Sequence, residues 1–539
     1  MTLMTGGEAL VKSLYREGVR VVFGLPGVQI YHTMDALAKE PGIRFINARH
    51  EQATTYMADG YARASGKIGT ALVVPGPGLL NATAGLGTAY AASSPVLLVA
   101  GQIERDQIGK NRGALHEIHD QLDTIRPLTK WASRVLDPNK IPSAVSQAFY
   151  HLRTGRPRPV ELEIPPETMS EVANIELREA GEYGRPTAHK KEILQGARIL
   201  ADAKNPLIWA GGGVISSGAS EALRQLAEYL QAPVITSIEG KGSLSDRHYL
   251  NLGVPRGLTS SWALDDPLRA QVIAADVVLA VGTRFVLAPS VLDGQRVVQI
   301  DVDHEEIGRN YANTFAVCGD ARRSLEDFLT VLAPMTPNRS SRRRELEAIK
   351  TDRFDHNKQV EPLGSYVRAI RAAMPDDGIF VGDMTQVSYH GRVFYPVYEP
   401  GTYLTSSYFG NLGFAFPTAL GAKVAQPDRP VVAVCGDGGF LYNSQELATA
   451  VQHNINAVVI VFNDNAYGNV LRDQLNSFEG RTIGASLHNP DFVKLAEAYG
   501  VTGIRVEGPD ALEATLRNTI GADAPFLIEV PVGMMPSPH

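Results

Sequence analysis

The sequence predicts an α/β protein of three domains, each built on a doubly wound parallel sheet. Continuous apolar runs such as residues 431–435 and 457–462 are rich in β-branched side chains and lack alternation, which is typical of fully buried parallel strands. Segments with a helical period separate these runs, so the chain alternates strand and helix. A length of 539 residues with 44% hydrophobic side chains is sufficient for about three separate cores.

The predicted elements fall into three groups along the chain. The first group contains a strand that ends in a Gly-Pro turn at 24–27, a strand–helix–strand unit over 69–102, and a buried strand followed by prolines. A polar, weakly periodic stretch over about 168–190 indicates a linker. We therefore place a first domain at 1–167, a central domain at 191–335 and a last domain at 362–539.

The unit at 69–102 and a unit at 430–465 share length and order, although few residues are identical. Each has a strand, a glycine-rich turn, a helix and a second strand, which suits a crossover of about thirty residues. The helix of the later unit is expected to begin at Asn443. The match hints that the first and last domains share one architecture.

Composition and charge disfavour several partners. The formal net charge of −7 is dispersed, which argues against nucleic acid or an anionic membrane as the main partner. The arginines at 342–344 fit a solvated helix face better than a nucleic-acid patch. Cys318 and Cys435 are far apart and lack metal-ligand spacing, so we expect no disulfide framework and a cytoplasmic location. We find no signal peptide and no apolar run that would span a bilayer, so we expect no membrane partner.

Two acidic residues follow the two apolar runs of the later unit. Asp437 lies within Gly-Asp-Gly-Gly after the first run, and Asp464 lies 27 positions later, after the second. Because the carboxyl ends of neighbouring parallel strands meet at one sheet edge, where ligands bind, we expect the two carboxylates close together. Carboxylates beside a glycine turn suit Mg²⁺ and a diphosphate. An ordinary glycine turn with an Asp helix cap is the alternative, whereas Leu441 excludes a dinucleotide fingerprint.

The motif GDGG, followed by NDNAYG at 463–468, resembles the thiamine diphosphate-dependent enzymes of the acetolactate synthase large-subunit and benzaldehyde lyase type. The resemblance implies that Asp437, Asp464 and the carbonyl of Ala466 hold Mg²⁺ against the cofactor diphosphate. Asp464 stands where the family more often has Asn, and it keeps an oxygen donor there. The other cofactor-binding residues that these two motifs imply are Gly436, Gly438, Gly439, Tyr467 and Gly468.

Glu51, in the stretch NARHEQ, matches the glutamate that contacts N1′ of the cofactor aminopyrimidine in this family. The resemblance implies that its protonated carboxyl donates to the ring, so that the 4′-imino form removes the C2 proton and gives the ylid. A carboxyl that stays protonated for this purpose needs an apolar pocket, and we expect Glu51 in one. On its own, a glutamate here would be a helix cap or a surface residue.

The stretch FGNLGF resembles the family segment in which a bulky apolar residue supports the bent cofactor. Leu412 is that residue, and Gly410 and Gly413 flank it. A simple core leucine is the alternative interpretation.

Pocket residues decide the second half of the reaction, and here the chain departs from the synthases. Gln29 follows Val28 where synthases carry Gly-Ala, and it falls where the benzaldehyde lyases have a histidine. His116 stands where synthases usually have Gln, and Asp473 replaces the tryptophan that positions their acceptor. We name Gln29, His32 and His116 as catalytic candidates because such donors would stabilise a developing oxyanion. A structural hydrogen bond is the alternative for each.

The resemblance implies a Mg²⁺- and thiamine diphosphate-dependent enzyme that takes a 2-oxo acid such as pyruvate, releases CO₂ and joins the remaining unit to a second carbonyl. The alternatives are a lyase that cleaves 2-hydroxy ketones, 2-hydroxyacyl-CoA or a cyclic dione, and a non-catalytic cofactor-binding module. Glycines 211–213 would let FAD approach the central domain, but the acidic pair of the FAD-containing synthases is missing after Arg284 and Phe285. The family also implies a site between two chains, hence a homodimer at least and a homotetramer by analogy.

Overall fold

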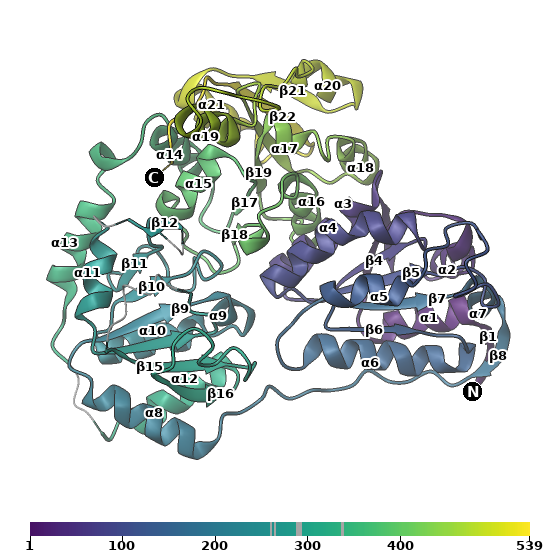
Figure 1. The fold of residues 1–539 in the computed structure, drawn as a ribbon, viewed down its shortest axis with the longest axis horizontal. Helices are drawn as coiled ribbons and strands as arrows, with labels where there is room; N and C mark the ends of the chain where they lie inside the picture. The colour runs from purple at the N-terminus through teal and green to yellow at the C-terminus, as the bar shows by residue number, and fades with distance from the viewer. Residues whose placement is uncertain (259–260, 264–265, 287–293, 336–338, 539) are drawn as a thin grey trace.

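The fold follows the predicted order of strands and helices. A computed structural model describes residues 1–258, 261–263, 266–286, 294–335 and 339–538. It has three domains, each with a six-stranded, wholly parallel sheet covered by helices (Figure 1). This confirms the predicted α/β class with three doubly wound sheets.

The first and last sheets have the same topology. The strand order is β3-β2-β4-β5-β7-β6 in the first sheet and β18-β17-β19-β20-β22-β21 in the last. When the strands are counted along the chain from β2 and from β17, the two orders are identical. This confirms the architecture shared by the two units. The first sheet contains β2 (Val21–Gly24), β3 (Arg44–Asn47), β4 (Gly69–Val73), β5 (Val96–Gly101), β6 (Trp131–Arg134) and β7 (Val160–Ile164). The last contains β17 (Ile379–Gly382), β18 (Tyr403–Leu404), β19 (Val431–Gly436), β20 (Val458–Asn463), β21 (Thr502–Arg505) and β22 (Phe526–Pro531).

The central sheet has the order β11-β10-β9-β14-β15-β16. Its strands are β9 (Pro206–Ala210), β10 (Val234–Thr236), β11 (Asn251–Gly253), β14 (Val277–Val281), β15 (Arg296–Asp301) and β16 (Thr314–Cys318), and the short pair β12 (Gly257–Leu258) and β13 (Ser261–Trp262) lies outside it. Its helices are α8 (Lys190–Asp202), α9 (Gly212–Ser216), α10 (Ser220–Leu230), α11 (Pro267–Ala274) and α12 (Ala321–Leu332), followed by α13 (Arg343–Arg353).

The outer domains carry most of the helices. The first has α1 (Gly6–Arg16), the short η1 (Val28–Ile30), α2 (Tyr31–Ala38), α3 (Glu51–Ser65), α4 (Pro77–Ala92), α5 (Gln121–Ile125) and α6 (Ile141–Arg153). The last has α14 (Leu363–Ala373), α15 (Gln386–Phe394), α16 (Ala415–Ala425), α17 (Asp437–Phe440), α18 (Glu446–His453), α19 (Gly468–Ser477), α20 (Phe492–Ala498) and α21 (Gly508–Thr519).

Helices α3 and α16 join the first and last domains. They lie side by side (Figure 1), and most of their residues are buried. A methyl group on Gly60 would lie 2.0 Å from the carbonyl oxygen of Thr418, and one on Gly421 would lie 1.9 Å from that of Met57. The two glycines therefore permit direct backbone contact between the helices, which holds α3 against the last domain.

The linker predicted over about 168–190 is shorter in the structure. Helix α7 (Pro166–Ser170) and strand β8 (Val172–Ile175) occupy its first part, and β8 pairs antiparallel with the N-terminal strand β1 (Thr2–Thr5). Only Ile175 of β8 is buried, so no apolar period marks this strand in the sequence. The connection to α8 begins after Ile175 and runs along the lower edge of Figure 1.

The helix expected to begin at Asn443 begins instead at Glu446, and the short helix α17 occupies the GDGG turn. Asn443 is buried, and its Nδ2 donates to the carbonyl of Gly413 at 2.6 Å. This long-range hydrogen bond explains why the local pattern misplaced the helix start.

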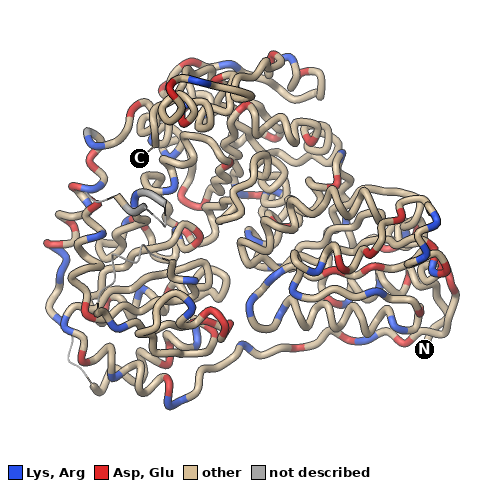
Figure 2. Tube along the Cα trace, in the orientation of Figure 1, with Lys and Arg blue, Asp and Glu red and all other residues tan. Residues whose placement is uncertain are grey.

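Both signs of charge are interspersed over the three domains (Figure 2). Arg343 and Arg344 are exposed on α13, as predicted, whereas Arg342 is half-buried before this helix and donates to Asn205 Oδ1 at 3.0 Å. The two cysteines are free. None of the helices among the described residues combines the length and the hydropathy that a membrane span needs.

Candidate active site

Two carboxylates lie together at the carboxyl end of the last sheet. Strands β19 and β20 are neighbours, with Gly436 opposite Phe462, so Asp437 and Asp464 follow adjacent strand ends. Asp437 is 2% exposed, and the Gly438 N–H donates to its Oδ1 at 2.9 Å. Burial raises the pKa of Asp437, and burial together with the charge of Asp437 raises the pKa of Asp464 to about 6.

This carboxylate pair fits a divalent cation. Asp437 is buried and Asp464 is half-buried; two like charges this close repel each other and are poorly solvated, and a bound cation relieves both effects. The N–H of Ala466 donates to Asp464 Oδ1 at 3.2 Å, and a methyl group on Gly468 would lie 2.2 Å from Asp464 Oδ2. A side chain at position 468 would therefore displace the Asp464 carboxylate from this place, where it supplies the oxygen donors that Mg²⁺ prefers.

The turn that carries Asp464 is held by a segment further along the chain. Asn465 has φ of +54°, and its carbonyl accepts the N–H of Leu487 at 2.7 Å. The N–H of Tyr467 donates to the carbonyl of Ala485 at 2.8 Å. A methyl group on Gly438 would lie 2.6 Å from the Tyr467 ring, so the two sequence motifs are in direct contact.

Two residues at this site were not predicted. Asn489 donates from Nδ2 to Asp437 Oδ2 at 2.6 Å and to Asn463 Oδ1 at 3.0 Å. Asp383 follows β17, the other neighbour of β19, and accepts the Gly413 N–H at 3.1 Å, while burial raises its pKa to about 6. Asp383 could have been predicted from the sequence, because it follows the carboxyl end of a strand, as Asp437 and Asp464 do. Asn489 lies 52 positions after Asp437, in a loop without a distinctive pattern.

Leu412 lies in the loop that Asp383 holds. Gly410 and Gly413 have φ of +67° and +80°, in the left-handed region that favours glycine. A methyl group on Gly413 would also lie 2.5 Å from Tyr442 Cβ, and Leu412 itself is half-buried. The two glycines thus shape the loop that presents Leu412.

Glu51 begins α3 at the carboxyl end of the first sheet. The residue is 9% exposed, and Asn81 Nδ2 donates to its Oε2 at 3.0 Å. A methyl group on Gly78 would lie 3.6 Å from Glu51 Oε1 and 2.6 Å from Val74 Cγ2, so Gly78 and Val74 pack on this side. The surroundings of Glu51 therefore combine one polar contact with an apolar wall.

Gln29 and His116 form a hydrogen-bonded pair. Gln29 is 4% exposed, its Nε2 donates to the carbonyl of Leu115 at 3.1 Å, and its Oε1 lies 2.9 Å from His116 Nδ1. A methyl group on Gly76 would lie 2.3 Å from the His116 carbonyl, so the His116 loop packs on the turn before α4. The structure thus joins two candidates that are 87 positions apart. His32 is exposed on α2, and among the described hydrogen bonds none links it to this pair.

The pair Gln29 and His116 lies in a different part of the chain from Asp437 and Asp464. Figure 1 places α2, next to Gln29, well apart from α17 and α19. Asp473 lies on α19, and its side chain is exposed. Large apolar side chains are exposed at both places: Val28, Tyr31, Leu80 and Leu115 in the first domain, and Val470, Leu475, Phe478 and Ile483 in the last.

Comparison with known proteins identifies the family of the chain. Three models of thiamine pyrophosphate enzymes match the chain: the N-terminal TPP binding domain at residues 4–124, the central domain at 193–328 and the C-terminal TPP binding domain at 383–530. The chain belongs to the thiamine pyrophosphate enzymes.

This thiamine pyrophosphate enzyme is similar over almost its whole length to proteins with two activities. A probable acetolactate synthase large subunit of Methanocaldococcus jannaschii is 35% identical over 98% of the chain and 92% of the relative. The acetolactate synthase large subunit of Haemophilus influenzae is 35% identical over 96% and 92%. A probable 2-ketoarginine decarboxylase of Pseudomonas aeruginosa is 34% identical over 98% and 94%.

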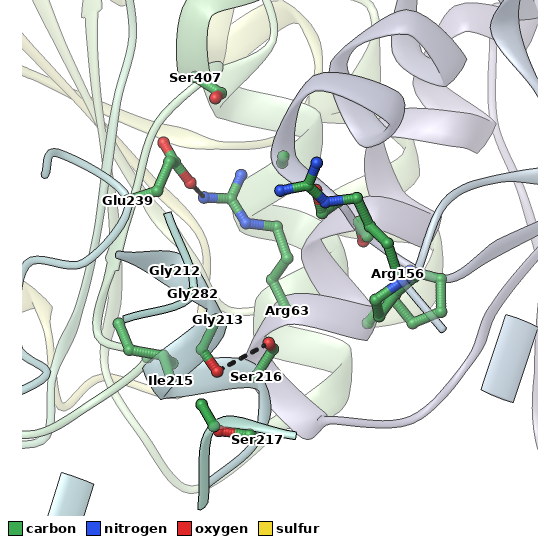
Figure 3. Close-up of a pocket in the computed structure, with 18 of the residues that line it drawn as sticks. Arg63, Arg156, Gly212, Gly213, Ile215, Ser216, Ser217, Glu239, Gly282 and Ser407 are labelled. Atoms are coloured by element: carbon green, nitrogen blue, oxygen red, sulfur yellow. Dashed lines mark hydrogen bonds and ion pairs between the residues drawn. The ribbon is translucent and has the colours of Figure 1, made fainter. Parts of the chain in front are cut away.

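A large cavity lies between the central domain of this thiamine pyrophosphate enzyme and the two outer domains (Figure 3). Its volume is about 1350 Å³, and Gly212 and Gly213 line it. Arg63 pairs with Glu239 at 2.9 Å in its wall. A methyl group on Gly213 would lie 2.6 Å from Gly282 Cα, so packing of these two turns requires a glycine there whatever the cavity binds.

Proposed function

We propose that the chain is a Mg²⁺- and thiamine diphosphate-dependent enzyme that takes a 2-oxo acid such as pyruvate, releases CO₂ and joins the remaining acyl unit to a second carbonyl compound. The buried Asp437 and the half-buried Asp464 at adjacent strand ends carry the proposal, because two carboxylates this close repel each other unless a cation binds. The similarity to acetolactate synthase large subunits supports the ligation step.

The last domain would hold the cofactor diphosphate. Asp437, Asp464 and the carbonyl of Ala466 are the proposed Mg²⁺ ligands, and the glycines of the two motifs let the diphosphate approach the backbone. Leu412 would support the bent cofactor from its glycine-flanked loop. The proposed cofactor-binding residues are Glu51, Gly410, Leu412, Gly436, Asp437, Gly438, Gly439, Asp464, Ala466, Tyr467 and Gly468.

Glu51 is the proposed proton-transfer residue. Thiamine diphosphate, when bound, supplies a nucleophilic carbon and an electron sink for the carbonyl substrate. Glu51 is buried and its Oε2 is held by Asn81, so its other oxygen can hold a proton toward a basic ring nitrogen. Glu51→Gln keeps the shape and removes this proton, and we expect turnover to fall by about 100-fold or more. Unchanged turnover would remove this role.

Gln29 and His116 are the proposed groups that act on the second carbonyl. Because Gln29 Nε2 donates to the Leu115 carbonyl, the amide oxygen of Gln29 faces His116, and Nδ1 of His116 is assigned as the donor to it. Gln29 occupies Nδ1, so His116 Nε2 is the ring nitrogen left to face substrate, and in the protonated ring it would donate to the oxygen that gains charge when the second carbonyl is attacked. His32, exposed on α2, is not included in this mechanism.

The active site is proposed to form between two chains. One chain keeps α2, beside Gln29, apart from α17 and α19 (Figure 1), and apolar side chains are exposed at both places. Exposed apolar patches of this kind are typical of protein interfaces. A second copy that turns its last domain toward the first domain would cover both patches and complete two sites. We propose a homodimer as the smallest active unit and a homotetramer of two such dimers.

The test is the reaction of purified protein, loaded with thiamine diphosphate and Mg²⁺, with pyruvate, followed by NMR. Acetolactate with CO₂ is the expected result. Acetaldehyde with CO₂ would indicate decarboxylation without ligation, the second candidate, which the similarity to a probable 2-ketoarginine decarboxylase favours. No loss of pyruvate would overturn the proposal and direct the search to a lyase acting on 2-hydroxy ketones, 2-hydroxyacyl-CoA or cyclic diones. A parallel preparation of E51Q shows whether any turnover belongs to this site.

The central cavity is proposed to take a nucleotide, and FAD is the first ligand to test. The cavity has the volume and the glycine turn at Gly212 and Gly213, while Arg156 in its wall is already paired with Glu306 at 2.7 Å. Flavin absorbance of the purified protein, or binding of added FAD, is the expected result. A colourless protein that does not bind added FAD would contradict this assignment.

A further inference from the structure

A buried carboxylate of the last domain binds the start of the helix that carries Glu51. Glu446 is the first residue of α18 and is fully buried. Its Oε1 accepts the backbone N–H groups of Arg49 and His50, each at 3.1 Å, and its Oε2 accepts the Thr449 hydroxyl at 2.6 Å. Because α3 and α18 belong to different domains, this contact joins the last domain to the start of α3.

Glu446 accepts hydrogen bonds from the N–H of His50, the N-cap residue of α3, and from that of Arg49, the residue before it. Such groups have no acceptor within the helix, and the partial positive charge at a helix N-terminus favours an anion. His50 is the N-cap residue, and its ring accepts the Gln52 N–H at 3.2 Å. The N–H groups of Arg49 and His50 take Glu446 as their acceptor. A buried carboxylate is costly unless it is hydrogen-bonded in this way, so the contact is specific.

A second contact from the same segment holds the residue after Glu51. Gln52 Nε2 donates to the carbonyl of Tyr442 and to Oδ1 of Asn443, both at 3.0 Å. Asn443 in turn donates to the carbonyl of Gly413 at 2.6 Å. Glu51 therefore lies between residues that are anchored to the last domain on both sides.

We propose that Glu446 is a positioning residue that sets the place of the Glu51 carboxyl by holding the backbone of Arg49 and His50. The proposal rests on the proposed function of Glu51, and Glu446 acts through Glu51 rather than on substrate or cofactor. Loss of the acceptor lets the first turn of α3 shift, and a misplacement of about 1 Å costs about 100-fold in rate.

Substitutions of Glu446 separate its hydrogen bonds from its charge. E446Q keeps an oxygen for the two N–H groups and turns its amide nitrogen to the Thr449 hydroxyl, so we expect Glu51-dependent chemistry within about threefold of wild type. E446A removes the acceptor, and E446D withdraws it by about 1.5 Å. We expect both to slow that chemistry by about 10- to 100-fold. E17Q is the matched control: Glu17 is a buried first-domain carboxylate paired with Arg153, and we expect no effect.

Two readouts need no substrate. In the protein without cofactor, amide hydrogen exchange over residues 49–52 is expected to speed up in E446A and E446D but not in E446Q or E17Q. In the protein loaded with thiamine diphosphate and Mg²⁺, hydrogen–deuterium exchange at C2 of the cofactor, read by NMR after an acid quench, is expected to slow in the same two variants. Both readouts report on Glu51 and its helix directly.

A double-mutant cycle with E51Q decides between positioning and a merely structural role. Because Glu446 acts through Glu51, E446A is expected to cause no further loss of C2 exchange in the E51Q background. An equal loss in both backgrounds, or wild-type exchange in E446A, would overturn the inference. If E51Q itself exchanges at the wild-type rate, the proposed function fails instead, so the two failures are distinguishable. Should E446A not fold, E446D and E446Q carry the same comparison.

Discussion

The contact between α3 and α16 predicts a large effect from a single methyl group. In Gly421→Ala the new methyl would lie 1.9 Å from the carbonyl oxygen of Met57. An ordinary contact is about 3.5 Å, so the helices must separate by about 1.5 Å. The obstacle is backbone in a buried interface and cannot rotate away, so the cost lies at the upper end of overpacking, about 3 kcal/mol. A cost of this size corresponds to a Tm about 6–12 °C lower for a domain of this length.

Thermal unfolding followed by circular dichroism measures this effect, and Gly391→Ala provides the control. Gly391 lies inside α15, and the nearest atom to its new methyl is at 3.6 Å, an ordinary contact. Ala favours a helix over Gly by about 1 kcal/mol, so the same substitution is expected to leave Tm unchanged or raise it. A Tm for G421A within about 2 °C of wild type would show that the close approach of α3 and α16 is not required for the fold.

Three further predictions concern charge and the site. Burial raises the pKa of Glu446 from 4.5 to about 7, so the folded protein holds a proton that the unfolded chain has released. Stability should therefore fall as pH rises from about 4.5 to about 7, and E446Q should gain up to about 3 kcal/mol over wild type at pH 8 but not at pH 4.5; equal Tm differences at both pH values would refute this. D437A is expected to weaken Mg²⁺-dependent binding of thiamine diphosphate by about 10- to 100-fold in calorimetric titrations, and an unchanged Kd would remove Asp437 from the ligand set. Q29A and H116A are each expected to lower kcat, and the double variant no further than the worse single one, since the two side chains act as a pair; fully additive losses would show independent roles.

The pattern of apolar residues within a short segment was sufficient to predict the buried strands. The apolar runs that became β19 and β20 identified two buried strands, and their neighbouring ends placed Asp437 beside Asp464. The pairing of strands that lie far apart in the sequence could not be predicted from such patterns. β8 is held by β1, at the other end of the first domain, and only one of its residues is buried.

The same limit applies to the site. Gln29 and His116 were named separately, and only the fold shows that they share a hydrogen bond. Asn489 reaches Asp437 from a loop with no pattern of its own. Glu446 looks like an ordinary polar residue in an amphipathic helix, because its partners are backbone N–H groups almost 400 positions earlier in the chain, at Arg49 and His50. Every residue except proline has a backbone N–H group, so the side chains at these two positions do not indicate that Glu446 binds there.

The most direct test of the central claim is complementation between two inactive variants. E51Q and D437A are mixed under conditions that allow chains to exchange, and thiamine diphosphate-dependent turnover is measured before and after exchange. If each site takes Glu51 from one chain and Asp437 from the other, every mixed dimer has one intact site, and the mixture should regain about a quarter of wild-type activity. Activity that stays at the level of the separate variants after demonstrated exchange would show that Glu51 and Asp437 of one chain serve the same site, and would contradict the account.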